Sequence, residues 1–159
     1  MATVDREPHG DHPHSTAKIA THPIHPMLIP FPIVCFVGTF ITDIVYSRNL
    51  DPGWATASHW LLIIGVVMAA LAAAAGLTDY LGDDRIRKLG DALKHMLANV
   101  TAVVLELVNL ILRFNNSDFI ASTGVYISGV VVLILLYSGW KGGDLVYRHG
   151  IGVHDRSNM

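Results

Sequence analysis

Histidines and one aspartate lie at the ends of the long apolar stretches of this chain. His22 and His25 precede the first stretch, and Asp79 closes the second. His95 opens the third stretch, and His149 follows the fourth. Neutral imidazole is the commonest metal ligand among side chains and a frequent ligand of haem iron. If the four stretches run antiparallel, these side chains gather at one end, and we expect a metal or haem site there.

The expected ligands of that site fall into two groups. His25 and His95 are the expected direct ligands of haem b or of a transition-metal ion, and Asn99 or Asp79 would orient an imidazole from behind. Haem would also need an apolar slot between the two rings. The spacing matches no strong metal motif of the H-E-x-x-H kind. Further candidate ligands are His22, His149 and Asp79. Trp140 is the expected end of the fourth helix, after which Gly142-Gly143 would let the chain bend and return His149 to the bundle.

A regular polar stripe runs along the third apolar stretch. Its members follow one another at spacings of 4, 3, 4, 3 and 4, which places them on one face of a helix. They are His95, Asn99, Ala102, Glu106, Asn109 and Arg113. Lipid cannot satisfy such side chains, so this face should point into a helix bundle. Glu106, near the middle, is costly as an anion, and we expect it to be protonated, hydrogen-bonded or paired.

Two interpretations of the stripe remain open. Asn99, Glu106 and Asn109 either fasten helices together or line a pathway for protons or small solutes. Four helices are few for a transporter, so a pathway would require an oligomer. At the other end of the bundle, Asp43 and His59 are the expected members of a smaller polar pair.

The elements that position these residues are four membrane-spanning helices. The 159-residue chain is 52% hydrophobic and 15% charged, with a mean hydropathy of +0.44, whereas soluble domains carry about 25% charged residues. Each apolar segment is close to the roughly 20 residues that cross a bilayer core. We place the segments at 27–47, 60–81, 95–114 and 120–140. The expected fold class is therefore all-α, a polytopic membrane protein built as a four-transmembrane-helix bundle.

The rest of the chain is expected to form tails and connections. We expect residues 1–20 to be a disordered, His-containing cytoplasmic tail, because they lack apolar content. The transmembrane domain would occupy 21–153, and 154–159 would be a short C-terminal tail. A single cysteine, Cys35, excludes a disulfide within the chain. The net charge of −2 gives no support for binding nucleic acid.

The basic residues predict the orientation of the bundle. With four spans, the N-terminus, the middle connection and the C-terminus share one side, which holds nine Lys and Arg residues. The other side holds only Arg48 and Arg113. Short cytoplasmic loops carry an excess of Lys and Arg, so both termini are expected in the cytoplasm.

Several pieces of the sequence resemble DUF2231, a bacterial membrane family catalogued as a domain of unknown function. The pieces are HPIHPMLIPFPIV at 22–34 with Asp43, GLTDY at 76–80, His95 with Asn99, and SGWKGGDLVYRHGIGV at 138–153. The resemblance covers about residues 21–153 and implies a four-helix domain of the bacterial inner membrane. Some similar domains share a chain with a Rieske-type iron–sulfur domain, which implies a redox setting. His59 lies outside the matching pieces.

The expected function is a small inner-membrane protein that binds haem or a metal through a cytoplasmic-side histidine cluster and serves in electron transfer. Besides the lipid bilayer, its expected partner is a redox protein or further copies of itself. The alternatives are a proton or small-solute pathway along the stripe, and a structural or assembly subunit of a larger membrane complex. Enzyme activity is left open as the less expected outcome. Hydrolase chemistry finds little support, since the sequence has no nucleophile elbow, no phosphate-binding glycine loop and no paired catalytic carboxylates.

Overall fold

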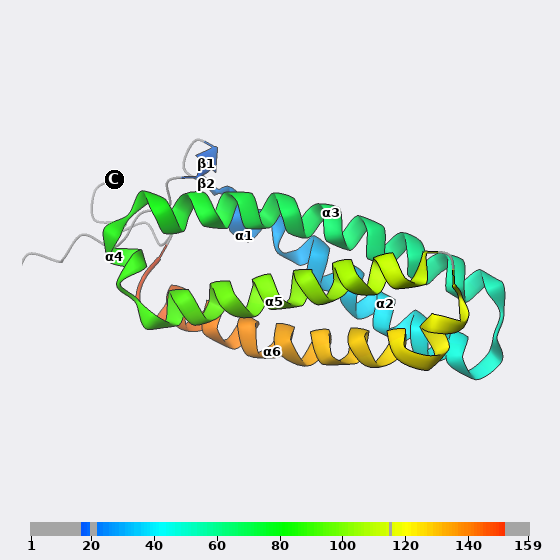
Figure 1. Ribbon diagram of the computed structural model, residues 1–159. Coiled ribbons are helices and arrows are strands. Elements are labelled where there is room, and N and C mark those ends of the chain that lie inside the picture. The colour runs from blue at the N-terminus through cyan, green and yellow to red at the C-terminus, as the bar shows by residue number, and fades with distance from the viewer. Residues whose placement is uncertain (1–16, 20–21, 115, 152–159) are drawn as a thin grey trace, which may run out of the picture.

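The structure, a computed structural model, describes residues 17–19, 22–114 and 116–151, and this part of the chain is almost entirely helical (Figure 1). A two-stranded antiparallel hairpin comes first, formed by β1 (Lys18–Ile19) and β2 (His22–Pro23). The helices that follow are α1 (Ile24–Leu28), α2 (Pro30–Asn49), α3 (Pro52–Gly82), α4 (Asp84–Arg87), α5 (Gly90–Arg113), the π-helical turn η1 (Ile120–Gly124) and α6 (Val125–Tyr147).

Four helical segments of the described residues are long and apolar enough to cross a membrane: Ile24–Asn49, Pro52–Gly82, Gly90–Arg113 and Ile120–Tyr147. The all-α, four-span class predicted from the sequence is confirmed. The helices are longer than the predicted apolar segments. Their end turns contain polar and proline residues, which an apolar pattern does not include. Before α3, the side chain of Asp51 accepts a hydrogen bond of 2.8 Å from the backbone N of Gly53, and Pro52 occupies the first helical position.

The predicted end of the fourth helix near Trp140 is wrong. α6 continues through Gly142 and Gly143 to Tyr147, and no bend occurs between them. Glycine within a helix costs only about 1 kcal/mol relative to alanine, so two glycines weaken the helix without ending it.

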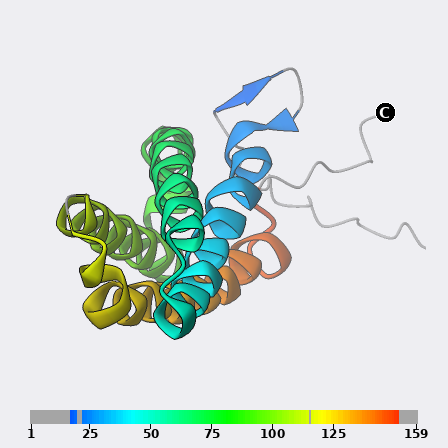
Figure 2. The same ribbon diagram turned by 90° about the vertical axis from the view of Figure 1, so that its right-hand side faces the viewer.

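The four spans form a bundle with two distinct ends (Figure 1). The hairpin, α4 and the last turn of α6 lie at one end, which we call the α4 end. The connections from α2 to α3 and from α5 to η1 lie at the opposite end. α2 packs against α3 and α6, and α5 packs against the same two helices. α2 and α5 therefore lie on a diagonal of the bundle (Figure 2).

The interior of the bundle holds a small apolar core with polar residues toward both ends. The core consists of Phe36, Leu62, Ala69, Ala102 and Val131, all buried. Large apolar side chains cover much of the outer surface, an arrangement that suits a lipid environment and not water. α5 turns its polar stripe inward, and Glu106, Asn109 and Arg113 are buried, as predicted.

The N-terminal hairpin is tied to α3 and to the start of α1 by backbone hydrogen bonds of Ala17 and Ile24. The backbone N of Ala17 donates a 2.7 Å hydrogen bond to Oδ1 of Asp79 on α3, and the N of Ile24 donates to the carbonyl of Ala17. The rest of the predicted tail at 1–20, and the tail at 154–159, lie outside the described residues.

The close contact of α2 with α3 leads to a stability prediction at Gly65. A Cβ atom there would lie 2.7 Å from Cε1 of Phe36 and 3.0 Å from Cβ of Cys35. Gly65→Ala therefore overpacks the core, and we expect it to lower the free energy of unfolding by about 1–3 kcal/mol. Thermal unfolding of the detergent-solubilised protein, followed by circular dichroism, measures the change.

The matched control for this prediction is Gly139→Ala on α6, because a Cβ at Gly139 meets nothing within 4 Å. Alanine should there raise stability by about 0.5–1 kcal/mol, through helix propensity alone. Equal effects of the two substitutions would contradict the packing described for Gly65.

Candidate functional site

His25 of α1 and His95 of α5 meet inside the bundle toward the α4 end, and we call them the histidine pair. Their ring centroids are 6.3 Å apart and their planes are inclined at 86°. The two residues lie 70 positions apart in the sequence and come from segments on the diagonal of the bundle. The structure thus brings together the two histidines that the sequence analysis selected as direct ligands.

Backbone carbonyls of the other two spans fix the proton on each ring of the histidine pair. Nδ1 of His25 lies 2.7 Å from the carbonyl oxygen of Ala72 on α3, and Nδ1 of His95 lies 2.9 Å from that of Ser138 on α6. A carbonyl only accepts hydrogen bonds, so each Nδ1 must carry the hydrogen. In a neutral imidazole the Nε2 atom then has a free lone pair, and this lone pair can bind a metal.

Two glycines make room for the rings. A Cβ atom at Gly76 would lie 2.8 Å from Cε1 of His25, and one at Gly142 would lie 3.1 Å from Cε1 of His95. Each imidazole therefore fills the space that a side chain would otherwise take. Sequence reasoning missed these glycines and Ser138 as parts of the site, although they lie in the pieces at 76–80 and 138–153 that carry the family resemblance.

Asn99 lies one helical turn after His95 and holds that ring from the side. Its Nδ2 atom lies 3.2 Å from Nε2 of His95, and it also donates to the backbone carbonyl of His95 at 2.9 Å and to Oγ of Ser138 at 2.7 Å. The stripe spacing placed Asn99 on the face of α5 that carries His95.

The other expected ligands do not join the histidine pair. Nε2 of His149 lies 3.5 Å from Oδ2 of Asp91, whose Oδ1 pairs with Lys141 at 3.1 Å. Asp79 accepts from the backbone of the hairpin, and His22 lies in β2. Across residues 17–19, 22–114 and 116–151, no three His, Cys, Asp or Glu side chains are grouped so that they could hold a metal ion. The predicted larger cluster is therefore reduced to two imidazoles.

A second polar cluster lies at the opposite end of the bundle around a buried ion pair. Both side chains of the pair, Arg113 and Asp43, are fully shielded. Nη1 of Arg113 donates to Oδ1 of Asp43 at 3.0 Å and Nη2 donates to Oδ2 at 2.9 Å, the two-bond geometry that matches guanidinium to carboxylate. Ser58 of α3 and Ser128 of α6 also donate to Asp43. All four spans therefore contribute to the pair.

Asn109 connects this ion pair to Glu106. Its Oδ1 accepts from Nε and Nη2 of Arg113 at 3.1 and 2.7 Å, and its Nδ2 donates to Oε2 of Glu106 at 2.9 Å. Glu106 is completely buried, and its Oε1 atom has no hydrogen-bond partner among the described residues. We call the six residues the Arg113 network: Asp43, Ser58, Glu106, Asn109, Arg113 and Ser128.

The expected pairing of Asp43 with His59 is replaced by the pairing of Asp43 with Arg113. The half-buried His59 ring instead packs against Phe114, with centroids 5.4 Å apart. An arginine offers two parallel donors and a permanent charge, which a neutral imidazole cannot match. The signal that could have revealed this partner was the position of Arg113 on the stripe, four residues after Asn109. Ser58 and Ser128 were missed because nothing in the sequence distinguishes them from other serines.

The π-helical turn η1 leaves room for the arginine head group. Gly124 ends this turn, and a Cβ atom there would lie 3.1 Å from Nη2 of Arg113 and 3.2 Å from Oδ1 of Asn109. Wide helical turns of this kind occur often at functional sites, and this one lets α6 start beside the guanidinium.

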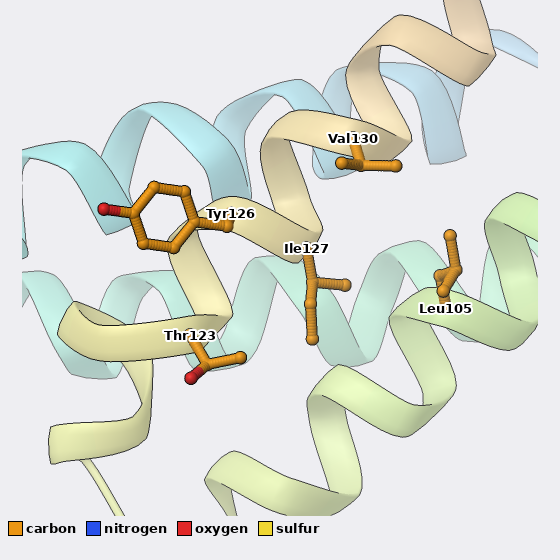
Figure 3. Close-up of a pocket in the computed structure, with 5 residues that line it drawn as sticks. All are labelled: Leu105, Thr123, Tyr126, Ile127 and Val130. Carbon is orange, nitrogen blue, oxygen red and sulfur yellow. The ribbon is translucent and has the colours of Figure 1, made fainter.

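Two hollows are lined by residues outside both clusters. One, of about 190 Å³, is lined by apolar parts of α5, η1 and α6, including Leu105, Ile127 and Val130 (Figure 3). The other, of about 340 Å³, lies beside the hairpin and is lined by residues that include Met27 and Val146. Neither hollow includes a residue of the histidine pair or of the Arg113 network.

The chain matches the model of a protein family, described as a predicted membrane protein (DUF2231), over residues 21–155, which is most of the chain. No curated protein and no solved structure matches the chain.

The Arg113 network predicts a strong energetic coupling between Asp43 and Arg113. Asp43→Leu leaves a buried guanidinium without its counter-ion and should lower the free energy of unfolding by about 3–5 kcal/mol. The double variant Asp43→Leu with Arg113→Met removes both charges and should recover much of the loss. Unfolding in mixed detergent micelles with rising dodecyl sulfate measures all three proteins.

Asp118→Leu provides the matched control, because Asp118 is an exposed carboxylate near the same end of the bundle. We expect no measurable change in its unfolding. If the losses of unfolding free energy caused by Asp43→Leu and Arg113→Met simply added in the double variant, the coupling of Asp43 with Arg113 would be contradicted.

Proposed function

The chain belongs to the DUF2231 family of predicted membrane proteins, and we propose that it is a small membrane redox component that binds haem b or a transition-metal ion between His25 and His95. The observation that carries this proposal is the proximity of two imidazoles whose Nδ1 atoms are both occupied by backbone carbonyls. Their two Nε2 lone pairs are the candidate metal donors of the site, and Nε2 of His95 lies 3.2 Å from the amide nitrogen of Asn99.

The separation of the rings suits one shared ion. Imidazole nitrogens bind transition metals at about 2.0–2.1 Å, and the ring centre lies about 1 Å farther out, so two rings on opposite sides of an ion are roughly 6 Å apart. The observed distance between centroids is 6.3 Å. A mutual inclination of 86° places no restriction on such an arrangement, because each ring binds through one nitrogen only.

The number of protein ligands and the space around them bear on the choice between haem and a bare metal ion. A metal ion bound by protein alone usually has three or four side-chain ligands, and the described residues provide two at this place. Haem iron needs only two axial ligands, because the macrocycle supplies the rest, so the donor set favours haem. The macrocycle would also need a slot beside the rings, and neither of the two hollows described above is lined by His25 or His95, so a bare ion with water as its further ligand is the second candidate.

Whichever ion binds, the surrounding residues have defined tasks. The carbonyls of Ala72 and Ser138 hold the rings in the tautomer that exposes Nε2. Asn99 must turn its amide away from Nε2 of His95, and its bonds to the carbonyl of His95 and to Ser138 can hold it nearby. A bound iron or copper ion would supply one-electron chemistry, with a redox protein or a second copy of the chain as the exchange partner.

A proton or solute pathway along α5 has less support. The C-terminal half of the stripe on α5 belongs to the Arg113 network. There Arg113, Asp43 and Asn109 are buried and linked by hydrogen bonds. Such a network fastens helices together. The remaining alternative, a structural or assembly subunit of a larger complex, has no observation of its own in its favour.

The proposed location is the bacterial inner membrane, with the α4 end in the cytoplasm. The nine Lys and Arg residues of the termini and the middle connection support this orientation. The burial of Arg113 strengthens the asymmetry, because it leaves Arg48 as the exposed cation of the opposite side.

Absorption spectroscopy and metal analysis of one purified sample test the proposed site. Haem produces a Soret band, and a bare ion produces about one equivalent of non-haem metal per chain. His25→Ala or His95→Ala should lower the bound amount by more than about tenfold, since even the loss of an orienting neighbour costs about 10–100-fold in metal affinity.

His59→Ala and His149→Ala are the controls, and both should retain the bound group, because neither ring belongs to the histidine pair. The proposal fails if the protein carries neither group and takes up neither added haemin nor added iron or copper. It fails equally if His149→Ala abolishes binding as completely as His95→Ala.

Reporter fusions test the proposed orientation in bacterial cells. Alkaline phosphatase, which is active only outside the cytoplasm, should be inactive when joined after Met159 and active when inserted within residues 48–58. A reporter that folds only in the cytoplasm should give the reverse pattern. An active phosphatase after Met159 would place the histidine pair on the outer side.

A further inference from the structure

Glu106 is the one side chain of the Arg113 network whose charge has no partner. Arg113 and Asp43 neutralise each other through two hydrogen bonds. Near this pair, α3 provides Ser58 and the imidazole of His59, which packs against Phe114, and α6 provides Ser128; none of the three carries a permanent charge. An ionised Glu106 would therefore leave one uncompensated negative charge in a region that excludes water.

The hydrogen bonds of Glu106 also suit a neutral carboxyl group. An ionised carboxylate has two acceptor oxygens, and hydrogen bonds to both of them are what stabilise its charge inside a protein. Glu106 accepts one, from Nδ2 of Asn109 to Oε2, and its Oε1 has no partner among the described residues. In a carboxylic acid, Oε2 is then the carbonyl oxygen and Oε1 is the hydroxyl that bears the proton.

We propose that Oε1 of Glu106 is a buried proton-binding site, whose occupancy is controlled by the Asp43–Arg113 ion pair. While the pair is intact, the network is neutral only with the proton bound. If Asp43 loses its charge, Arg113 needs a new counter-ion, and Glu106, joined to it through Asn109, releases its proton to water and takes that place. This site is independent of any ion at the histidine pair, because it involves none of the same residues.

The chain has a composition that makes this proposal directly measurable. It contains only two glutamates, Glu7 and Glu106. In a Glu7→Gln background, glutamate labelled with ¹³C at the side-chain carboxyl carbon gives one signal in the full-length protein. The chemical shift of this carbon distinguishes a carboxylic acid from a carboxylate, so nuclear magnetic resonance of the protein in lipid bilayers reports the proton on Glu106.

At neutral pH the signal should lie at the position of a carboxylic acid. Infrared absorption gives a second measurement, in which a protonated carboxyl band present in the Glu7→Gln protein disappears in the Glu7→Gln/Glu106→Gln protein. A signal at the carboxylate position would overturn the proposal, whether or not any further variant folds.

Asp43→Asn tests whether the ion pair determines the protonation of Glu106. It preserves the shape of the side chain, removes its charge and should move the Glu106 signal to the carboxylate position at the same pH. Ser128→Ala is the matched control, since it removes one hydrogen bond of the network without changing a charge, and the signal should stay in place. If Asp43→Asn does not fold, Asp43→Ser replaces it. An unchanged Glu106 signal in the folded Asp43 variant would overturn the proposal that the ion pair determines the protonation of Glu106.

Discussion

Lipid offers no hydrogen bonds, and this constraint governs where each polar side chain of the four spans lies. The chain places Asp43, Glu106, Asn109 and Arg113 at zero or nearly zero exposure, although all belong to membrane-spanning helices. Each then needs a partner from within the bundle. The bonds of Arg113 to Asp43 and Ser58, and of Asn109 to Ser128, join different helices, so they also fix how the helices pack. Glu106 is bonded only to Asn109 of its own helix.

The polar groups of the two clusters are hydrogen-bonded in different ways. In the Arg113 network, charges of opposite sign cancel and the hydrogen bonds close upon themselves, apart from one oxygen of Glu106. The histidine pair is less closed, because the carbonyls of Ala72 and Ser138 occupy the protonated nitrogens, while of the two Nε2 lone pairs that of His95 is contacted by Asn99. A closed cluster suits the fastening of helices, whereas an open one suits the binding of an ion.

Small residues permit both clusters. Gly76 and Gly142 lie against the imidazoles of the pair, and Gly124 lies against the guanidinium of Arg113. At each place a large polar ring or head group occupies the position of a missing side chain, so that it can reach across to another helix. Glycine is tolerated there because the tertiary contacts outweigh its modest cost in helix stability. The family match over residues 21–155 includes all of these positions.

The sequence by itself determined the number of spans and the inward face of α5. Both are local properties, since apolar length identifies a span and a spacing of three and four residues identifies a helix face. The partners of the polar residues were decided only by the tertiary structure. The sequence offers His149 as a further ligand, but in the structure α6 continues to Tyr147 and His149 lies beside Asp91. The sequence also offers His59 as the partner of Asp43, but Arg113 makes the two hydrogen bonds to that carboxylate. Such choices depend on how helices distant in sequence are rotated and spaced against each other, which no periodicity within one helix specifies.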